Sequence, residues 1–91
     1  MSTATLTDIP RIARGFRLQW EDAQQAYVLL YPEGMVQLNA SAGQILSRCD
    51  GARSVADLVG ELEREFEAEG LSGDVLAFLD LAARQRWVEW P

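Results

Sequence analysis

Few residues in this 91-residue chain could carry out catalysis or bind a metal. The chain has no histidine, so its single cysteine, Cys49, lacks the imidazole partner that makes a thiol a nucleophile. The same composition excludes metal sites built from His and Cys, and the acidic residues lack the spacing of a calcium-binding loop. We therefore expect no metal, no other cofactor and no enzymatic activity.

The remaining chemistry-bearing residues are carboxylates, of which the densest group is Glu61, Glu63, Glu65, Glu67 and Glu69. They alternate along a segment with helical periodicity, so they spread over several helix faces instead of converging on a pocket. We interpret them as a solvated surface. Cys49 falls on an apolar helical stripe and is interpreted as a core residue. The glycines are isolated, so no Gly-rich loop is available to bind phosphate.

The charge and hydropathy of the chain also restrict its partners. Fourteen acidic against eight basic residues give a net charge of -6, which repels the phosphate backbone of nucleic acids. No signal-type N-terminus and no uninterrupted apolar run of about 18 residues is present. We expect a cytoplasmic protein that binds neither nucleic acid nor membrane.

The elements that would position a binding site begin with three strands. Strict alternation of apolar and polar residues predicts a half-buried strand from Phe16 to Glu21. The segment from Ala26 to Tyr31 is apolar on both faces, so we expect it in the centre of a sheet. The turn Tyr31-Pro32-Glu33-Gly34 leads to a third strand, Met35 to Leu38, which must lie at an edge.

Apolar residues at helical spacing predict three helices in the second half of the chain. Ser41 followed by Gln44 has the spacing of a capping box, and we expect the helix that it opens to end at Asp50-Gly51. Ser54 with Asp57 predicts the start of a second helix, which runs to about Glu67.

The same patterns predict the start of the third helix, the C-terminal segment and the aromatic residues of the core. Ser72 is placed to cap this helix. The last residues, Trp87 to Trp90, form either a short strand or a packed extension. Periodicity places several aromatic residues in the core: Phe16, Trp20, Tyr27, Tyr31 and Phe66.

This order of elements predicts an α+β fold that is winged-helix-like, with a three-stranded antiparallel sheet followed by a three-helix bundle. Residues 1–8 are expected to be a flexible tail and residues 9–91 a single peptide-recognition domain. Its first residues, 9–12, read as an extended arm, because the residue before a proline favours extended conformations.

Two surfaces are left for a partner after the core is assigned: the free strand edge and part of the third helix. Around that helix Phe78 lies about 300° and Leu76 about 100° from Val75, so its apolar arc is wider than packing requires. An extended peptide would pair with the strand edge and place its side chains beside the helix. The predicted peptide-binding residues are Met35, Val36, Gln37, Leu38, Val75, Phe78, Leu79, Ala82 and Arg86. Among these, Val36, Gln37 and Leu38 are expected to bind through their backbone.

Several segments of the chain, between Pro10 and Trp87, match a known family in order and separation. They are Arg14-Gly15-Phe16, Leu29-Leu30-Tyr31-Pro32-Glu33-Gly34, Leu38-Asn39, Ile45-Leu46, Cys49-Asp50-Gly51, Asp74-Val75, Phe78-Leu79 and Trp87. On these residues the chain resembles the pyrroloquinoline quinone biosynthesis protein D family.

The resemblance implies a non-catalytic peptide chaperone in pyrroloquinoline quinone biosynthesis. Its partners would be the ribosomal precursor peptide and the radical S-adenosylmethionine enzyme that cross-links a Glu and a Tyr of that peptide. In similar recognition domains the leader peptide adds a strand beside the third strand and packs against the third helix.

Two other functions remain open from the residues alone. A winged-helix nucleic-acid-binding domain agrees with the topology but not with the charge, because the third helix carries Asp74 and Asp80 against Arg84 and Arg86. A purely structural homodimer would exchange the N-terminal arm or the Pro32-Gly34 hinge between chains and cover the edge that a peptide needs.

Overall fold

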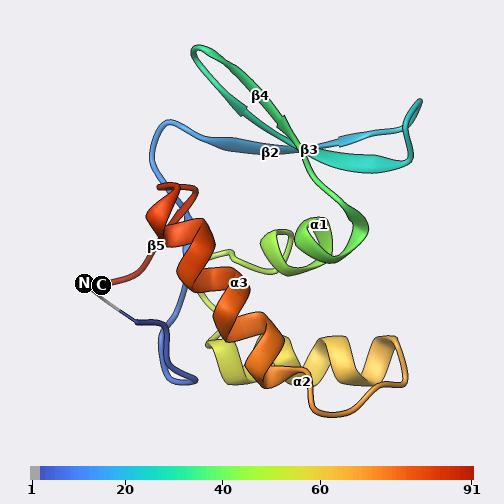
Figure 1. Cartoon of the computed structure of the whole chain (residues 1–91), viewed down its shortest axis with the longest axis vertical. Coiled ribbons are helices and arrows are strands. Elements are labelled where there is room, and N and C mark those ends of the chain that lie inside the picture. Colours follow the sequence, from blue (N-terminus) through green and yellow to red (C-terminus); the bar gives the residue numbers. More distant parts are fainter. Residues whose placement is uncertain (1–2) are drawn as a thin grey trace.

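The computed structural model describes residues 3–91, and the three strands of the main sheet precede three helices as the sequence predicts (Figure 1). The elements are β1 (Arg11–Ile12), β2 (Arg17–Glu21), β3 (Ala26–Tyr31), β4 (Gly34–Gln37), α1 (Ala40–Leu46), α2 (Val55–Glu65), α3 (Ser72–Arg84) and β5 (Val88–Glu89). The predicted α+β, winged-helix-like class is confirmed. Across these residues no helix is both long and apolar enough to cross a membrane.

β2, β3 and β4 form an antiparallel sheet with β3 in the centre. Leu29 of β3 lies between Leu18 of β2 and Val36 of β4, and its side chain is fully buried. Val28 points to the opposite face and is buried too, which confirms that the central strand is apolar on both faces. β4 lies at an edge, as predicted.

The helical layer meets the sheet where α1 packs against β3. A Cβ atom at Gly43 of α1 would lie 2.9 Å from Cδ2 of Tyr27, so glycine is required for this close approach. Figure 1 shows α1 between the sheet and α2. One buried cluster joins the three helices to the sheet and includes Leu29, Leu38, Ile45, Leu46, Val55, Leu58, Leu62, Val75, Leu79 and Val88.

The start and end of α1 differ from the prediction. The Asn39 side chain, and not that of Ser41, caps the helix by accepting a hydrogen bond of 2.8 Å from the Ala42 amide. Asn39 has the extended backbone of a cap residue, which leaves Ser41 inside the first turn. α1 ends at Leu46 instead of Asp50-Gly51, because the backbone bonds that follow span three residues, as in a 3₁₀ turn.

The second predicted capping box is confirmed and the third predicted cap is wrong. Ser54 and Asp57 satisfy each other's backbone amides at the start of α2. α3 begins at Ser72 itself, and Leu71 occupies the cap position without a side-chain bond. Glu63 of α2 instead accepts a hydrogen bond of 3.0 Å from the Leu71 amide. A tertiary contact thus replaces the local cap.

The two ends of the domain form a second, two-stranded sheet. Arg11 pairs with Glu89 and Ile12 with Val88, in antiparallel register. The Arg11 guanidinium also lies 2.7 Å from the Glu89 carboxylate. Of the two alternatives for the C-terminal segment, the short strand is therefore the one observed.

The residues before β1 contact the helices. The carbonyl oxygens of Leu6 and Asp8 accept hydrogen bonds of 2.9 and 2.8 Å from the first two amides of α2, which have no partner within the helix. The Ala4 amide donates to Oδ1 of Asp80 at 2.7 Å. The first two residues of the predicted tail lie outside the described residues, and the division of the chain into 1–8 and 9–91 stays a prediction.

Two aromatic residues predicted in the core are exposed instead. The Trp20 side chain is 44% exposed, since it lies on the edge strand β2, which has a neighbouring strand on one side only. Phe66 is 52% exposed because it follows the last turn of α2, where the apolar stripe no longer faces the core. Phe16, Tyr27 and Tyr31 pack against the sheet or its core as partly buried residues.

Cys49 is buried in the core, as predicted. Burial raises the pKa of its thiol to about 12, with a smaller contribution from the neighbouring Asp50 carboxylate. Its Sγ atom lies 3.4 Å from the Ile45 carbonyl oxygen.

We predict that a thiol-reactive reagent at pH 8 modifies Cys49 roughly a thousandfold more slowly in the folded chain than in denaturant, since the thiolate is both rare and inaccessible. Absorbance of the released reagent group measures both rates. Equal rates in the two conditions would contradict the burial of this side chain.

Candidate functional site

The edge of β4 offers backbone groups that have no partner in the sheet. The Leu38 amide donates to the Tyr27 carbonyl oxygen at 3.3 Å, so Leu38 faces β3. In an antiparallel pair the bonded residues alternate, which turns Val36 toward β3 and Met35 and Gln37 away from it. The free edge therefore presents the N-H and C=O groups of Met35 and Gln37. The backbone groups of Val36 and Leu38, which were predicted to bind a peptide, face the neighbouring strand instead.

The side chains of β4 divide between the two faces of the sheet. Met35 is 47% exposed, and Gln37 on the same face is exposed as well. Val36 and Leu38 point to the face that carries the helices, where Val36 is partly buried and Leu38 is buried. A strand added beside β4 would thus meet Met35 and Gln37 on one face and the helical layer on the other.

Three predicted groove residues of α3 lie inside the core. Val75, Leu79 and Ala82 are buried in the cluster that also contains Leu38. They hold α3 against the domain, and of the three only Val75 also lines an open surface, in the pocket between the helices. Periodicity identified their common face correctly but could not show how deeply the other helices cover it.

The accessible apolar flank of α3 is formed by Phe78, which is partly buried, and by Leu81, which is 41% exposed. Asp80 lies about 200° around the helix from Phe78, and it is Asp80 that bonds the Ala4 amide. The described N-terminal segment therefore covers the opposite flank. Leu81 was missed in the sequence, although its spacing of three residues from Phe78 places it on this flank.

An apolar pocket of about 300 Å³ opens between the three helices. It is lined by Ala40, Ser41, Gln44, Ile45, Leu62, Phe66, Ala68, Leu71, Asp74 and Val75. Ala40 follows Gln37 by three residues, so the chain itself limits the distance from the β4 edge to the pocket wall to about 11 Å. Of the predicted site residues, only Val75 contributes to this pocket. Its formation from three separate helices left no local signal in the sequence.

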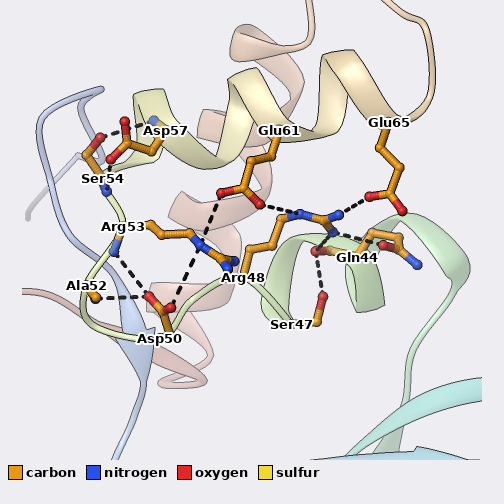
Figure 2. Close-up of polar contacts among 10 residues, drawn as sticks. All are labelled: Gln44, Ser47, Arg48, Asp50, Ala52, Arg53, Ser54, Asp57, Glu61 and Glu65. Carbon is orange, nitrogen blue, oxygen red and sulfur yellow. Dashed lines mark hydrogen bonds and ion pairs between the residues drawn. The ribbon is translucent and has the colours of Figure 1, made fainter.

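A polar network joins α1 to α2 beside this pocket (Figure 2). The Arg48 side chain is only 12% exposed. Its Nη1 atom donates to the Gln44 carbonyl and side-chain oxygens at 3.0 and 2.9 Å, and its Nε atom lies 3.5 Å from Oε1 of Glu61. Glu65 pairs with the same guanidinium, as Figure 2 shows. Arg48 therefore holds the last turn of α1 against α2.

The carboxylates interpreted as a solvated surface are thus partly structural. Glu61 also pairs with Arg53 at 3.1 Å, whereas Arg64, its neighbour on the helix, forms no ion pair with it in the described part of the chain.

Hydrogen bonding to the Ala52 amide lowers the pKa of Asp50. Within residues 3–91, no three His, Cys, Asp or Glu side chains gather in a way that could hold a metal ion.

Arg86, the last of the predicted site residues, lies just beyond the end of α3. Its φ of 65° is in the left-handed region, and its amide donates to the Ala83 carbonyl oxygen at 3.0 Å. Its side chain is exposed and has no acidic partner among the described residues.

The fold and these surfaces define a class: a small winged-helix-like domain whose sheet ends in an open edge strand and whose third helix keeps an accessible apolar flank. The family model for coenzyme PQQ synthesis protein D, PqqD, matches residues 26–88. The chain belongs to this family.

Named relatives support the assignment over nearly the whole length. A "PqqA binding protein" of Azotobacter vinelandii is 54% identical over 90 residues, which are 98% of each chain. A protein of the same name from Klebsiella pneumoniae is 48% identical over 90% of each chain. The solution structure of the PqqD part of Methylobacterium extorquens PqqCD, described as a RiPP recognition element, covers 94% of each chain with a TM-score of 0.78 and 30% identity.

We predict that Arg48→Met lowers the free energy of unfolding by about 2 kcal/mol, since it removes charge-assisted hydrogen bonds from a nearly buried group and leaves Glu61 without that partner. Urea denaturation measures the change through the midpoint at constant slope. The matched control, Arg84→Met, removes an exposed arginine that forms no ion pair within residues 3–91 and should change stability by less than about 0.5 kcal/mol. Equal effects of the two variants would contradict the structural role of Arg48.

Proposed function

We propose that this chain binds the precursor peptide of pyrroloquinoline quinone and presents it to the radical S-adenosylmethionine enzyme of the pathway, in the cytoplasm. The names of relatives that are about half identical over almost the entire chain support the peptide as ligand. The similarity to a structure described as a stand-alone recognition element supports a role in recognition. The chemistry would then belong to the enzyme, and the present chain would supply binding.

The observation that carries this proposal is the unpaired edge of β4. A peptide that runs antiparallel to β4 would form four backbone hydrogen bonds, two with Met35 and two with Gln37. Each contributes about 0.5 to 1.5 kcal/mol, and sequence variation in the peptide does not affect them.

Side-chain anchors would come from apolar surfaces of the helical layer. Phe78 and Leu81 form the accessible flank of α3, and the pocket between the helices accepts one apolar side chain. Two such anchors contribute about 1.5 to 3 kcal/mol each, before the ordering of the peptide is subtracted. These terms together give an affinity near the micromolar range.

The structure bears on the two other functions considered from the sequence. Of the described N-terminal residues, 4–8 contact α2 and α3 of their own chain and the arm at 9–12 pairs with β5, so these residues leave the β4 edge open. A homodimer is compatible with peptide binding if it uses a different surface. No observation favours nucleic-acid binding, and the net charge of -6 opposes it.

We predict that Gln37→Pro weakens binding of the precursor peptide about threefold to tenfold, since proline removes the outward N-H and one hydrogen bond with it. Proline is tolerated at this position of an edge strand because the lost N-H points to solvent and not into the sheet. Calorimetric titration of the full chain with the synthetic precursor peptide measures the affinity.

Gln37→Ala is the matched control, because it removes the side chain and keeps the N-H, and its affinity should stay within about twofold of the parent chain. Equal affinities of the proline variant and the parent chain would exclude β4 as the docking edge. With the radical enzyme present, the proline variant should also yield less modified peptide at limiting concentration.

A further inference from the structure

The three-stranded sheet has a second free edge, which peptide binding at β4 does not use. On β3 the residues that face β4 alternate with those that face β2, so Val28 and Leu30 bond to β2. Their partners are Gln19 and Arg17, and the intervening β2 residues face outward. In the described part of the chain the backbone groups of Leu18 and Trp20 therefore have no partner.

The side chains of β2 are arranged almost symmetrically about Gln19. Arg17 lies at one end and Glu21 at the other, and all three side chains share the face of the sheet away from the helices. Within the chain, Arg17 donates to Gln19 at 3.1 Å and Gln19 donates to Glu21 at 3.1 Å. The side-chain charge along this edge thus changes from positive at Arg17 to neutral at Gln19 and negative at Glu21.

We propose that the β2 edge binds the β2 edge of a second copy of this chain, in an antiparallel arrangement with a twofold axis beside Gln19. This register places Arg17 opposite Glu21 of the second copy at both ends. It also places Leu18 opposite Trp20 of the second copy, so the outward N-H and C=O groups form four hydrogen bonds between the chains.

The charges select this arrangement over the alternatives. A parallel pairing in register would place Arg17 opposite Arg17 and Glu21 opposite Glu21, which is repulsive. In the antiparallel register the two charged pairs occupy non-hydrogen-bonded positions, where opposite side chains lie closest. A single-sign row of charges would instead protect the edge from pairing.

The helix-side face of β2 adds an apolar contact. Trp20 is exposed there and packs edge-on against Tyr27, with ring centroids 5.0 Å apart. Leu18 of the second copy would cover its exposed side. The resulting six-stranded sheet has a β4 edge at each end, so both copies keep a free peptide-binding edge.

Two strands of five residues bury less surface than the roughly 1,200 Å² of a stable interface. The dimer is therefore expected to be weak, forming at tens of micromolar and above, on the order of the weakest specific complexes.

Sedimentation equilibrium of the full chain, from about 5 μM to 1 mM, tests the proposal with three variants. Arg17→Glu and Glu21→Arg each place like charges opposite one another, and each should raise the dimer dissociation constant at least about tenfold. The double variant Arg17→Glu/Glu21→Arg restores opposite charges and should return the constant to within about threefold of the parent chain. Circular dichroism verifies that each variant is folded.

A parent chain that stays monomeric throughout this range would overturn the proposal. So would a dimer that neither single variant weakens, or one that the precursor peptide dissociates, because that dimer would use the β4 edge. Calorimetric titration of the charge variants with the precursor peptide keeps the two proposals separate. These variants should bind the peptide with the affinity of the parent chain, whatever their oligomeric state.

Discussion

A three-stranded antiparallel sheet satisfies the backbone of its central strand and leaves one row of polar groups free at each edge. In this chain the alternation is fixed by the bond from the Leu38 amide to Tyr27, which turns Met35 and Gln37 outward on β4. The same alternation turns Leu18 and Trp20 outward on β2. Each surface proposed for binding follows from this one constraint on the sheet.

The helices serve the sheet by holding β3 in place. Gly43 lets α1 approach Tyr27 closely, and Arg48 ties the end of α1 to α2. α3 is fixed by its buried residues and by the Glu63 bond to the Leu71 amide. What remains accessible on the helical layer is an apolar flank and a pocket, which suit side chains of an extended peptide and contain no cluster of metal-binding groups in the described residues.

Local patterns predicted the strands, the order of the helices and the edge position of β4, because alternation and helical spacing are properties of short segments. They failed where a distant residue decided the outcome. Glu63 replaces a cap at Ser72, and Trp20 is exposed because β2 lies at the edge of the sheet. The free flank of α3 and the pocket depend on how three helices pack together, so the sequence indicated a broad apolar arc without showing that Val75 and Leu79 are buried within it.

The central claim is that the precursor peptide pairs with the backbone of β4. Amide hydrogen exchange measured by NMR, with and without saturating peptide, tests it most directly, since an outward N-H exchanges freely until a strand covers it. The account predicts that the Met35 and Gln37 amides become at least about tenfold slower, while those of Leu18 and Trp20 do not. A saturated complex in which Met35 and Gln37 exchange as fast as in the free chain would contradict it.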